Sequence, residues 1–328
     1  MTPTNSRTRL RPIRWLAAAA LALALPALAQ DYPSRPVKII VPFSPGGAVD
    51  GPTRIVAQKL SERLGAQVVV ENKPGAGATL GAAEVAKAAP DGYTLLLASQ
   101  TNAISATLYG SKLAFDPVED FAPVMLIGEE PGVLVVHPSF PAKSLDEFIA
   151  YVRQNPGKVD YASSGNGSGQ HLFAAMLASM AGLRMNHIPY KGSAQATSDL
   201  LGGQVPVSIP GTAGMMGHIK AGKLRPLATT GAKRAEALPD VPAIAETLPG
   251  YEAYVWMGLL APKGTPQPVV DRLHRELVAV MALPDVKAFY AGHNLEIVAS
   301  TPADFGGFFR HEKERWARVI RETGAKID

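Results

Sequence analysis

The chain alternates two kinds of hydrophobic pattern. Short, nearly continuous apolar runs predict buried strands, whereas segments with an apolar residue every three to four positions predict amphipathic helices. The predicted strands cover residues 37–42, 67–71, 93–98, 159–162, 185–189, 205–209 and 224–229. The predicted helices cover residues 52–64, 79–89, 144–154, 168–181, 194–201, 268–281 and 302–322. Strands that alternate with helices of this length indicate an α/β fold with parallel sheets.

Two apolar stretches interrupt this alternation. Residues 124–127 with 133–137, and residues 251–260, have no obvious helix between them and the neighbouring strands. We interpret them as crossings between two α/β lobes. One lobe comprises residues 30–127 plus 260–328 and the other residues 128–259. This arrangement predicts a hinged cleft, and ligands favour such clefts at the carboxyl ends of parallel strands.

The N-terminus has the pattern of a secretory signal peptide. Four arginines precede an apolar run over residues 15–25, and Ala27-Leu28-Ala29 follows as a small-x-small cleavage site. The run is well short of the ~20 residues that span a bilayer. We therefore predict a signal peptide over residues 1–29, cleavage after Ala29, and export to the periplasm. An uncleaved anchor is the alternative.

Removing this segment changes the charge balance. The whole chain has 32 Lys and Arg against 28 Asp and Glu, a formal charge of +4. The four arginines Arg7, Arg9, Arg11 and Arg14 leave with residues 1–29, which contain no acid, so the predicted mature chain has no net charge. No basic block remains to bind phosphates, and we expect no nucleic-acid partner.

Composition and motifs also exclude several chemistries. The chain has no cysteine, which excludes catalytic thiols and cysteine-based metal sites. The seven histidines show no metal-type spacing, and the chain lacks the motifs of lipases, zinc proteases and P-loop proteins. The Gly75-x-Gly77-x-x-x-Gly81 spacing imitates a dinucleotide loop, but no acidic residue ends the next strand. We predict no metal, no cofactor and no catalytic residues.

The loop after the first strand is the first candidate binding segment. It contains Phe43, Ser44, Gly46, Gly47 and Asp50. The glycines allow a backbone to approach a ligand closely, and Asp50 is expected to cap the following helix. N–H groups at a helix start favour an anion. The loop therefore predicts a carboxylate cradle, with an ordinary βα turn as the alternative.

A second loop follows the strand predicted over residues 159–162. Its seven residues 163–169 include three glycines and three serines, which offer many N–H and O–H donors for a small oxyanion. Its candidate ligand residues are Ser163, Ser164, Gly165, Gly167, Ser168 and His171. His171 lies about one turn inside the helix, where a structural histidine is the more common case. A flexible linker is the alternative for the loop.

Two further strand ends offer polar groups. Tyr190 could present its hydroxyl to the cleft or seal it with its ring, while Lys191 is more typical of a solvated surface lysine. Ser99 and Thr101 follow the strand predicted over residues 93–98 and form a weaker candidate.

The motifs in these segments resemble those of the Bug family, the periplasmic solute receptors of tripartite tricarboxylate transporters. The resemblance covers most of the chain from Tyr32 to about Gly324. It rests on Pro42-Phe43 with Gly46-Gly47 and Asp50, on residues 71–77, 89–95 and 161–167 with His171-Leu172, on His187 with Pro189-Tyr190-Lys191-Gly192, on residues 238–242 with Glu246, and on Ala261-Pro262 with Gly264-Thr265-Pro266.

The resemblance implies a type II periplasmic binding protein fold, in which two lobes close on one small solute. It implies a carboxylate ligand, an inner-membrane permease of the tripartite transporter as transient partner, and a receptor that does no chemistry. We also expect a monomer. The rival functions are a secreted hydrolase using Ser168 and His171, and a sensory ligand-binding module.

One segment departs from the family pattern. Family members often carry acidic residues after the segment Gly202-Gly203-Gln204-Val205, whereas residues 206–212 of this chain contain none. Thr212, at the end of this stretch, is a further candidate ligand residue. Without an acid there, we hypothesise a carboxylate that carries no cationic group.

Overall fold

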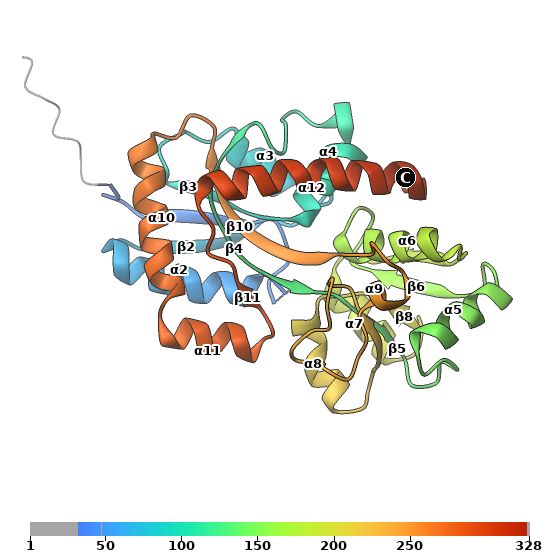
Figure 1. The fold of residues 1–328 in the computed structure, drawn as a ribbon. Coiled ribbons are helices and arrows are strands. Elements are labelled where there is room, and N and C mark those ends of the chain that lie inside the picture. Colours follow the sequence, from blue (N-terminus) through green and yellow to red (C-terminus); the bar gives the residue numbers. More distant parts are fainter. Residues whose placement is uncertain (1–31, 47, 327–328) are drawn as a thin grey trace, which may run out of the picture. The chain divides into compact units, whose positions relative to one another are not determined.

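Two mixed β-sheets organise the chain from Arg35 onward (Figure 1). A computed structural model describes residues 32–46 and 48–326. The predicted signal peptide (residues 1–29) and Gly47 therefore lie outside the described residues. Within the described part of the chain, no helix combines the length and the apolar character needed to cross a bilayer.

The first sheet has the strand order β11-β4-β10-β3-β1-β2. Its strands are β1 (Val37–Val41), β2 (Val68–Asn72), β3 (Thr94–Ser99), β4 (Phe121–Pro131), β10 (Tyr254–Pro262) and β11 (Glu296–Ile297). Strand β1 pairs in parallel with β2 and β3. Its sequence VKIIV is almost wholly apolar, as expected for a parallel strand covered on both faces.

The second sheet has the order β7-β6-β8-β5-β9. Its strands are β5 (Val133–Val136), β6 (Asp160–Ser163), β7 (Asn186–Pro189), β8 (Val207–Ser208) and β9 (Arg225–Thr229). Strand β6 runs parallel to β7 and β8, whereas β5 runs antiparallel to β8 and β9.

Helices connect most of the strands. They are α2 (Asp50–Leu64), α3 (Thr79–Ala86), α4 (Gln100–Leu108), α5 (Leu145–Gln154), α6 (Gly169–Ala181), α7 (Ser193–Leu201), α8 (Thr212–Lys220), α9 (Ile244–Thr247), α10 (Gln267–Met281), α11 (Pro284–Gly292) and α12 (Pro302–Thr323), with a short 3₁₀ turn, η1 (Gly110–Lys112). Helices α5 and α6 begin after Ser144 and Ser168, whose side chains accept hydrogen bonds from the first helical turn.

The prediction of parallel sheets is confirmed for β1, β2 and β3 and for β6, β7 and β8, but both sheets also contain antiparallel strands. Strand β10 runs antiparallel to both β3 and β4, and β5 is antiparallel to its neighbours. The reason lies in the connections, since β4 passes directly into β5 of the other sheet through Gly132, and β10 brings the chain back. The two apolar stretches 124–137 and 251–260 contain these connections. The prediction also missed helices α4, α8, α9 and α11.

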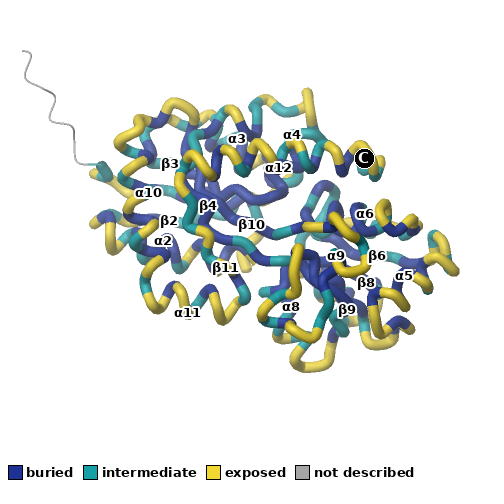
Figure 2. The backbone as a smooth tube through the Cα atoms, in the orientation of Figure 1, coloured by how far each residue is buried: buried dark blue, intermediate teal, exposed yellow. Residues whose placement is uncertain are grey.

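The apolar interior continues across the two sheets (Figure 2). One hydrophobic cluster includes Ile40 of β1 and Leu134 of β5, both fully buried. Helix α12 contributes to it on the side of α6, where the rings of Phe173 and Trp316 stack with centroids 5.8 Å apart. This packing holds α12 against α6, the helix that follows one of the candidate loops.

Candidate functional site

The carboxylate of Asp50 fixes the loop between β1 and α2. Its Oδ2 atom accepts hydrogen bonds from the Gly46 N–H at 3.0 Å and from Arg54 Nε at 2.9 Å. Its Oδ1 atom accepts one from Asn72 Nδ2 at 2.8 Å. Burial raises the pKa of Asp50, but these hydrogen bonds outweigh it, and the pKa lies below its usual value. The expected N-cap role is wrong, because α2 begins at Asp50 itself and Val49 is the N-cap residue.

The outer part of this loop remains open. Ser44 and Gly46 are exposed and Phe43 is half-buried. Gly46 has a φ of +74°, a conformation that side chains with a Cβ rarely adopt. The Phe43 carbonyl accepts a hydrogen bond from Asn72 Nδ2, which anchors the loop to β2. The loop is thus anchored by Asp50 and Asn72, while Ser44 and the neighbouring backbone are exposed to solvent.

The loop between β6 and α6 is held largely by its own hydrogen bonds. Ser163 is fully buried, and its Oγ accepts from the Gly165 N–H at 3.1 Å. The Gly167 N–H donates to Nδ1 of His171 at 3.2 Å, and Ser168 Oγ caps α6 by accepting from the His171 N–H. These five residues of the predicted cradle therefore shape the loop. Within the described part of the chain, Ser164 has neither its N–H nor its hydroxyl engaged.

The hydroxyl of Tyr190 is hydrogen-bonded within the protein, and its backbone helps to hold the candidate loops. The hydroxyl donates to Oδ2 of Asp199 at 2.8 Å, and burial together with this hydrogen bond raises the pKa of Tyr190 to about 12. The Tyr190 N–H donates to the Ser163 carbonyl, and the ring packs beside Ala162 and Ala196. The ring therefore supports the strand end, and Lys191 beside it is exposed.

Ser99 and Thr101 lie at a helix start that sequence patterns did not predict. Ser99 is the N-cap of α4, because its Oγ accepts from the Thr101 N–H and its own N–H donates to Asn102 Oδ1. Both predicted residues are buried. Their side chains order the start of α4, next to the candidate loops.

Thr212 is fully buried and pairs with an acid that the prediction did not consider. Its Oγ1 donates to Oε2 of Glu130 at 2.9 Å, and the Ala213 N–H donates to the same oxygen at 2.6 Å. Residues 206–212 contain no acid, but β4 brings Glu130 to this end of β8. Burial raises the pKa of Glu130 to about 7, despite the two hydrogen bonds. Glu130 is 1% exposed and so is not presented to solvent.

The predicted loops of the two sheets approach one another. A Cβ placed on Gly192, just before α7, would lie 3.7 Å from Ser44 Oγ of the first loop. A Cβ on Gly165 would lie 3.1 Å from the Tyr190 carbonyl oxygen, and one on Gly169, at the start of α6, would collide with the side chain of Gln100 at the start of α4. The structure thus brings the four segments predicted from the sequence to one place.

The electrostatic potential where these four loops converge is set mainly by backbone dipoles. Helices α2, α4, α6 and α7 all start here, and helix N-termini favour anions. Residues 42–50, 99–102, 163–171 and 187–193 contain a single lysine, Lys191, and no arginine. An anion bound among these loops would depend on N–H and O–H groups rather than on an ion pair.

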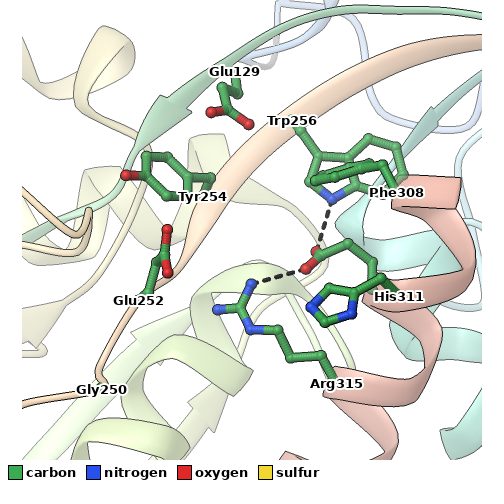
Figure 3. Close-up of a pocket in the computed structure, with 9 residues that line it drawn as sticks. Glu129, Gly250, Glu252, Tyr254, Trp256, Phe308, His311 and Arg315 are labelled. Carbon is green, nitrogen blue, oxygen red and sulfur yellow. Dashed lines mark hydrogen bonds and ion pairs between the residues drawn. The ribbon is translucent and has the colours of Figure 1, made fainter. Parts of the chain in front are cut away.

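A cavity that sequence reasoning missed lies between β10 and α12 (Figure 3). It has a volume of about 300 Å³. Its lining residues are Glu129, Gly250, Glu252, Tyr254, Trp256, Phe308, His311, Glu312 and Arg315. None of them belongs to the predicted loops. The one available signal in the sequence was the Glu129-Glu130 pair inside an otherwise apolar stretch.

This cavity holds more carboxylates than cations, with Glu129, Glu252 and Glu312 against Arg315. Burial, followed by the nearby charges of Glu296, Glu312 and Glu252, raises the pKa of Glu129 to about 7. Glu312 is buried and accepts hydrogen bonds from Trp256 Nε1 at 2.9 Å and from Arg315 Nη1 at 2.8 Å (Figure 3). Carboxylates that already repel one another would also repel an acidic solute. The cavity is therefore a poor place for a carboxylate ligand.

Comparison with known proteins agrees with the motifs. Residues 53–325 match the model of the tripartite tricarboxylate transporter family receptor. The protein BugT of Bordetella pertussis is 39% identical over 323 residues, which cover 98% of this chain and 99% of that protein.

Solved structures share the fold. The periplasmic binding protein BugD is 36% identical, with a TM-score of 0.84 over 90% of this chain and 99% of its own. A Rhodopseudomonas palustris protein with adipate is 34% identical, with a TM-score of 0.85 over 90% of this chain and all of its own. MatC from the same species, with bound malate, is 31% identical, with a TM-score of 0.82 over 88% of this chain and all of its own.

The family match and the similarity to BugT each extend over most of the chain, and the two-sheet fold agrees with those of the solved relatives. This chain therefore belongs to the tripartite tricarboxylate transporter family of receptors, the Bug family of periplasmic solute-binding proteins.

Proposed function

We propose that this chain binds a small organic carboxylate among the four loops that follow β1, β3, β6 and β7. The observation that carries the proposal is that Ser44, in a loop of the first sheet, lies close to Gly192, in a loop of the second sheet. Several helix N-termini lie beside these two residues. Backbone N–H groups of this kind hold anions without a cationic side chain. Ser44 and Ser164 supply hydroxyl groups for the same purpose.

Two relatives support the ligand class. The solved structures of the two Rhodopseudomonas palustris proteins contain adipate and malate, which are both dicarboxylates. The carboxylates of the cavity between β10 and α12 would repel a negatively charged ligand. The loops are therefore the more favourable site for a dicarboxylate. We retain the hypothesis that the solute has no cationic group, since Glu130 is turned toward Thr212 and Ala213 and away from solvent.

The proposal includes a closing motion and a route. Residues 30–127 plus 260–328 would form one lobe and residues 128–259 the other, with the connections of β4 and β10 as the hinge. The solute stabilises the closed form because it contacts loops of both lobes. The mature receptor, cleaved after Ala29, would act as a monomer in the periplasm and pass the solute to the transporter's permease.

A ligand screen tests the binding step. Mature protein (residues 30–328) is heated with adipate, malate, their diamides and a set of amino acids, after denaturation and refolding to remove any copurified solute. A ligand at ~100 times its dissociation constant adds roughly 2.7 kcal/mol, which raises the melting temperature by several degrees. We expect a shift with an acid and none with its diamide. A shift with the diamide alone contradicts the proposal.

The variant Ser164→Ala tests the place of binding. The substitution removes a hydroxyl group that we propose binds the ligand, and it adds no bulk to the loop. We therefore expect weaker binding of the same acid and an unchanged melting temperature of the free protein. Ser139→Ala, in the loop before α5, serves as control. Loss of acid uptake in a deletion strain would separate the transport role from the sensory alternative. Turnover of an ester substrate that disappears in Ser168→Ala would favour the hydrolase.

A further inference from the structure

Two histidines stack face to face beneath the loop that joins β6 to α6. The imidazole rings of His171 and His187 have centroids 3.9 Å apart and planes inclined by 4°. The ring of Tyr161 lies beside this pair, with its centroid 5.0 Å from that of His187 and 6.5 Å from that of His171. Tyr161 and His187 are register partners on the parallel strands β6 and β7, and His171 reaches over them from α6. Three elements therefore meet in one cluster of rings.

Each histidine holds a different part of the loop. Nδ1 of His171 accepts the Gly167 N–H at 3.2 Å. Nε2 of His187 shares a hydrogen bond of 2.6 Å with Oγ of Ser163. That hydroxyl in turn accepts the Gly165 N–H, so His187 acts on Gly165 through Ser163. The two rings thus fix both ends of the segment that carries Ser164.

The hydrogen bonds require a neutral His171, and burial favours a neutral His187. An Nδ1 atom that accepts an N–H cannot carry a proton, so His171 is held as a neutral imidazole with its hydrogen on Nε2. Positive charges on both rings at once would repel one another strongly at a centroid distance of 3.9 Å. His171 is 6% exposed and Tyr161 5% exposed, and burial lowers the pKa of His187 to about 4.

We propose that His171 and His187 are positioning residues for solute binding, which set the shape of residues 163–168 through Gly167 and Ser163. This inference rests on the proposed function, because it assigns these histidines to the same loop. Neither ring touches the solute in this scheme. This role explains why both histidines lie in motifs that resemble those of the family. Under this proposal His171, which was predicted to bind the ligand directly, acts on it only through the loop.

Paired substitutions separate positioning from packing. Asparagine places an amide oxygen near the position of the Nδ1 atom, and glutamine places its amide near the position of the Nε2 atom. We therefore expect His171→Asn and His187→Gln to bind adipate within about threefold of the unaltered protein, and His171→Leu and His187→Leu to bind it at least about tenfold more weakly. His293→Leu, at the end of α11, is the control histidine.

Amide hydrogen exchange provides a readout that does not need the ligand. In the leucine variants we expect faster exchange at residues 163–168 and little change in the central strands, with protection restored in His171→Asn and His187→Gln. The inference is overturned if the leucine variants retain protection of this segment, or if the amide variants lose as much as the leucine variants. If the unaltered protein binds neither adipate nor malate, the exchange result still decides this inference, while the proposed ligand class fails separately.

Discussion

Two regions of this molecule hold buried polar groups in opposite ways. The loops at the ends of β1, β3, β6 and β7 contain almost no charged side chain and consist of N–H and O–H groups at helix starts. The cavity between β10 and α12 is crowded with carboxylates, and Glu129 has a pKa near 7 there. A cavity with polar lining is thus not by itself a site for this solute class. The sign of the surrounding charge and dipoles decides which region suits an acid.

The largest effect is expected from the acidic region. In Glu312→Ala the side-chain N–H groups of Trp256 and Trp316 and the guanidinium of Arg315 lose their common acceptor. Removing one partner of such a buried network costs about 3–5 kcal/mol of unfolding free energy. Chemical denaturation measures this loss. Glu314→Ala, exposed on the same helix, is the control.

The same variant also tests whether the two regions are independent. If Glu312→Ala weakened adipate binding by the folded protein as strongly as a loop substitution does, the separation between the acidic cavity and the solute site would be wrong.

The second effect concerns Glu130, the neighbour of Glu129 on β4. Its folded-state pKa of about 7 lies above the ordinary 4.5, so the folded protein holds this proton more tightly than the unfolded chain. The stability from this group is fully present below pH 4.5 and is lost progressively as the pH rises to about 7, a change of about 3 kcal/mol.

Glu130→Gln should reduce the difference in stability between low and high pH by the part due to Glu130 and leave the part due to Glu129, because a neutral amide replaces one titrating group while the acceptor for Thr212 and Ala213 is kept. Denaturation curves at pH 5 and pH 8 measure it, with the exposed Glu236→Gln as control. An unchanged difference between the two pH values would show that another group titrates.

The third effect is on the loops. Gly165 has a φ of +129°, and an added Cβ would lie 3.1 Å from the Tyr190 carbonyl oxygen. Gly165→Ala must therefore distort the segment that carries Ser164, and we expect adipate affinity to fall by about tenfold or more. Gly214→Ala, with open space around it in α8, is the matched control. Equal affinities of the two variants would count against the loop as the site.

The loops and most elements could be predicted from the sequence. Apolar runs located strands such as β1 and β6, and Ser144 and Ser168 marked helix starts correctly. Helices α4 and α8 were missed because they are nine residues long and their periodicity is weak. The antiparallel course of β10 was also unpredictable, because strand direction depends on how the chain returns between sheets.

Partnerships between distant residues were beyond sequence reasoning. Nothing near residue 212 indicated that Glu130 would pair with Thr212, since 82 positions separate them. The stack of His171 on His187 likewise depends on how α6 lies over β7. Local patterns predict where loops are, whereas tertiary packing decides which of their donors remain open.

The smallest effect is expected from the lysine nearest the loops. Lys191 is exposed, and an exposed charge contributes little to binding because water and salt screen it. We expect Lys191→Ala to change adipate affinity by less than about threefold, with weak dependence on salt concentration. Calorimetric titration at low and high salt measures both. A loss of tenfold or more would show that an ion pair holds the acid and that backbone dipoles do not suffice.

The most direct test of the central claim is to locate the bound acid by NMR. Amide signals of the labelled mature protein are followed while adipate is added, with malate tested in parallel. We predict the largest shifts at Ser44, Ser164 and Gly192 in the loops, with Gly250 and His311 at the acidic cavity unchanged. The largest shifts at the cavity, with the loops unchanged, would contradict the account.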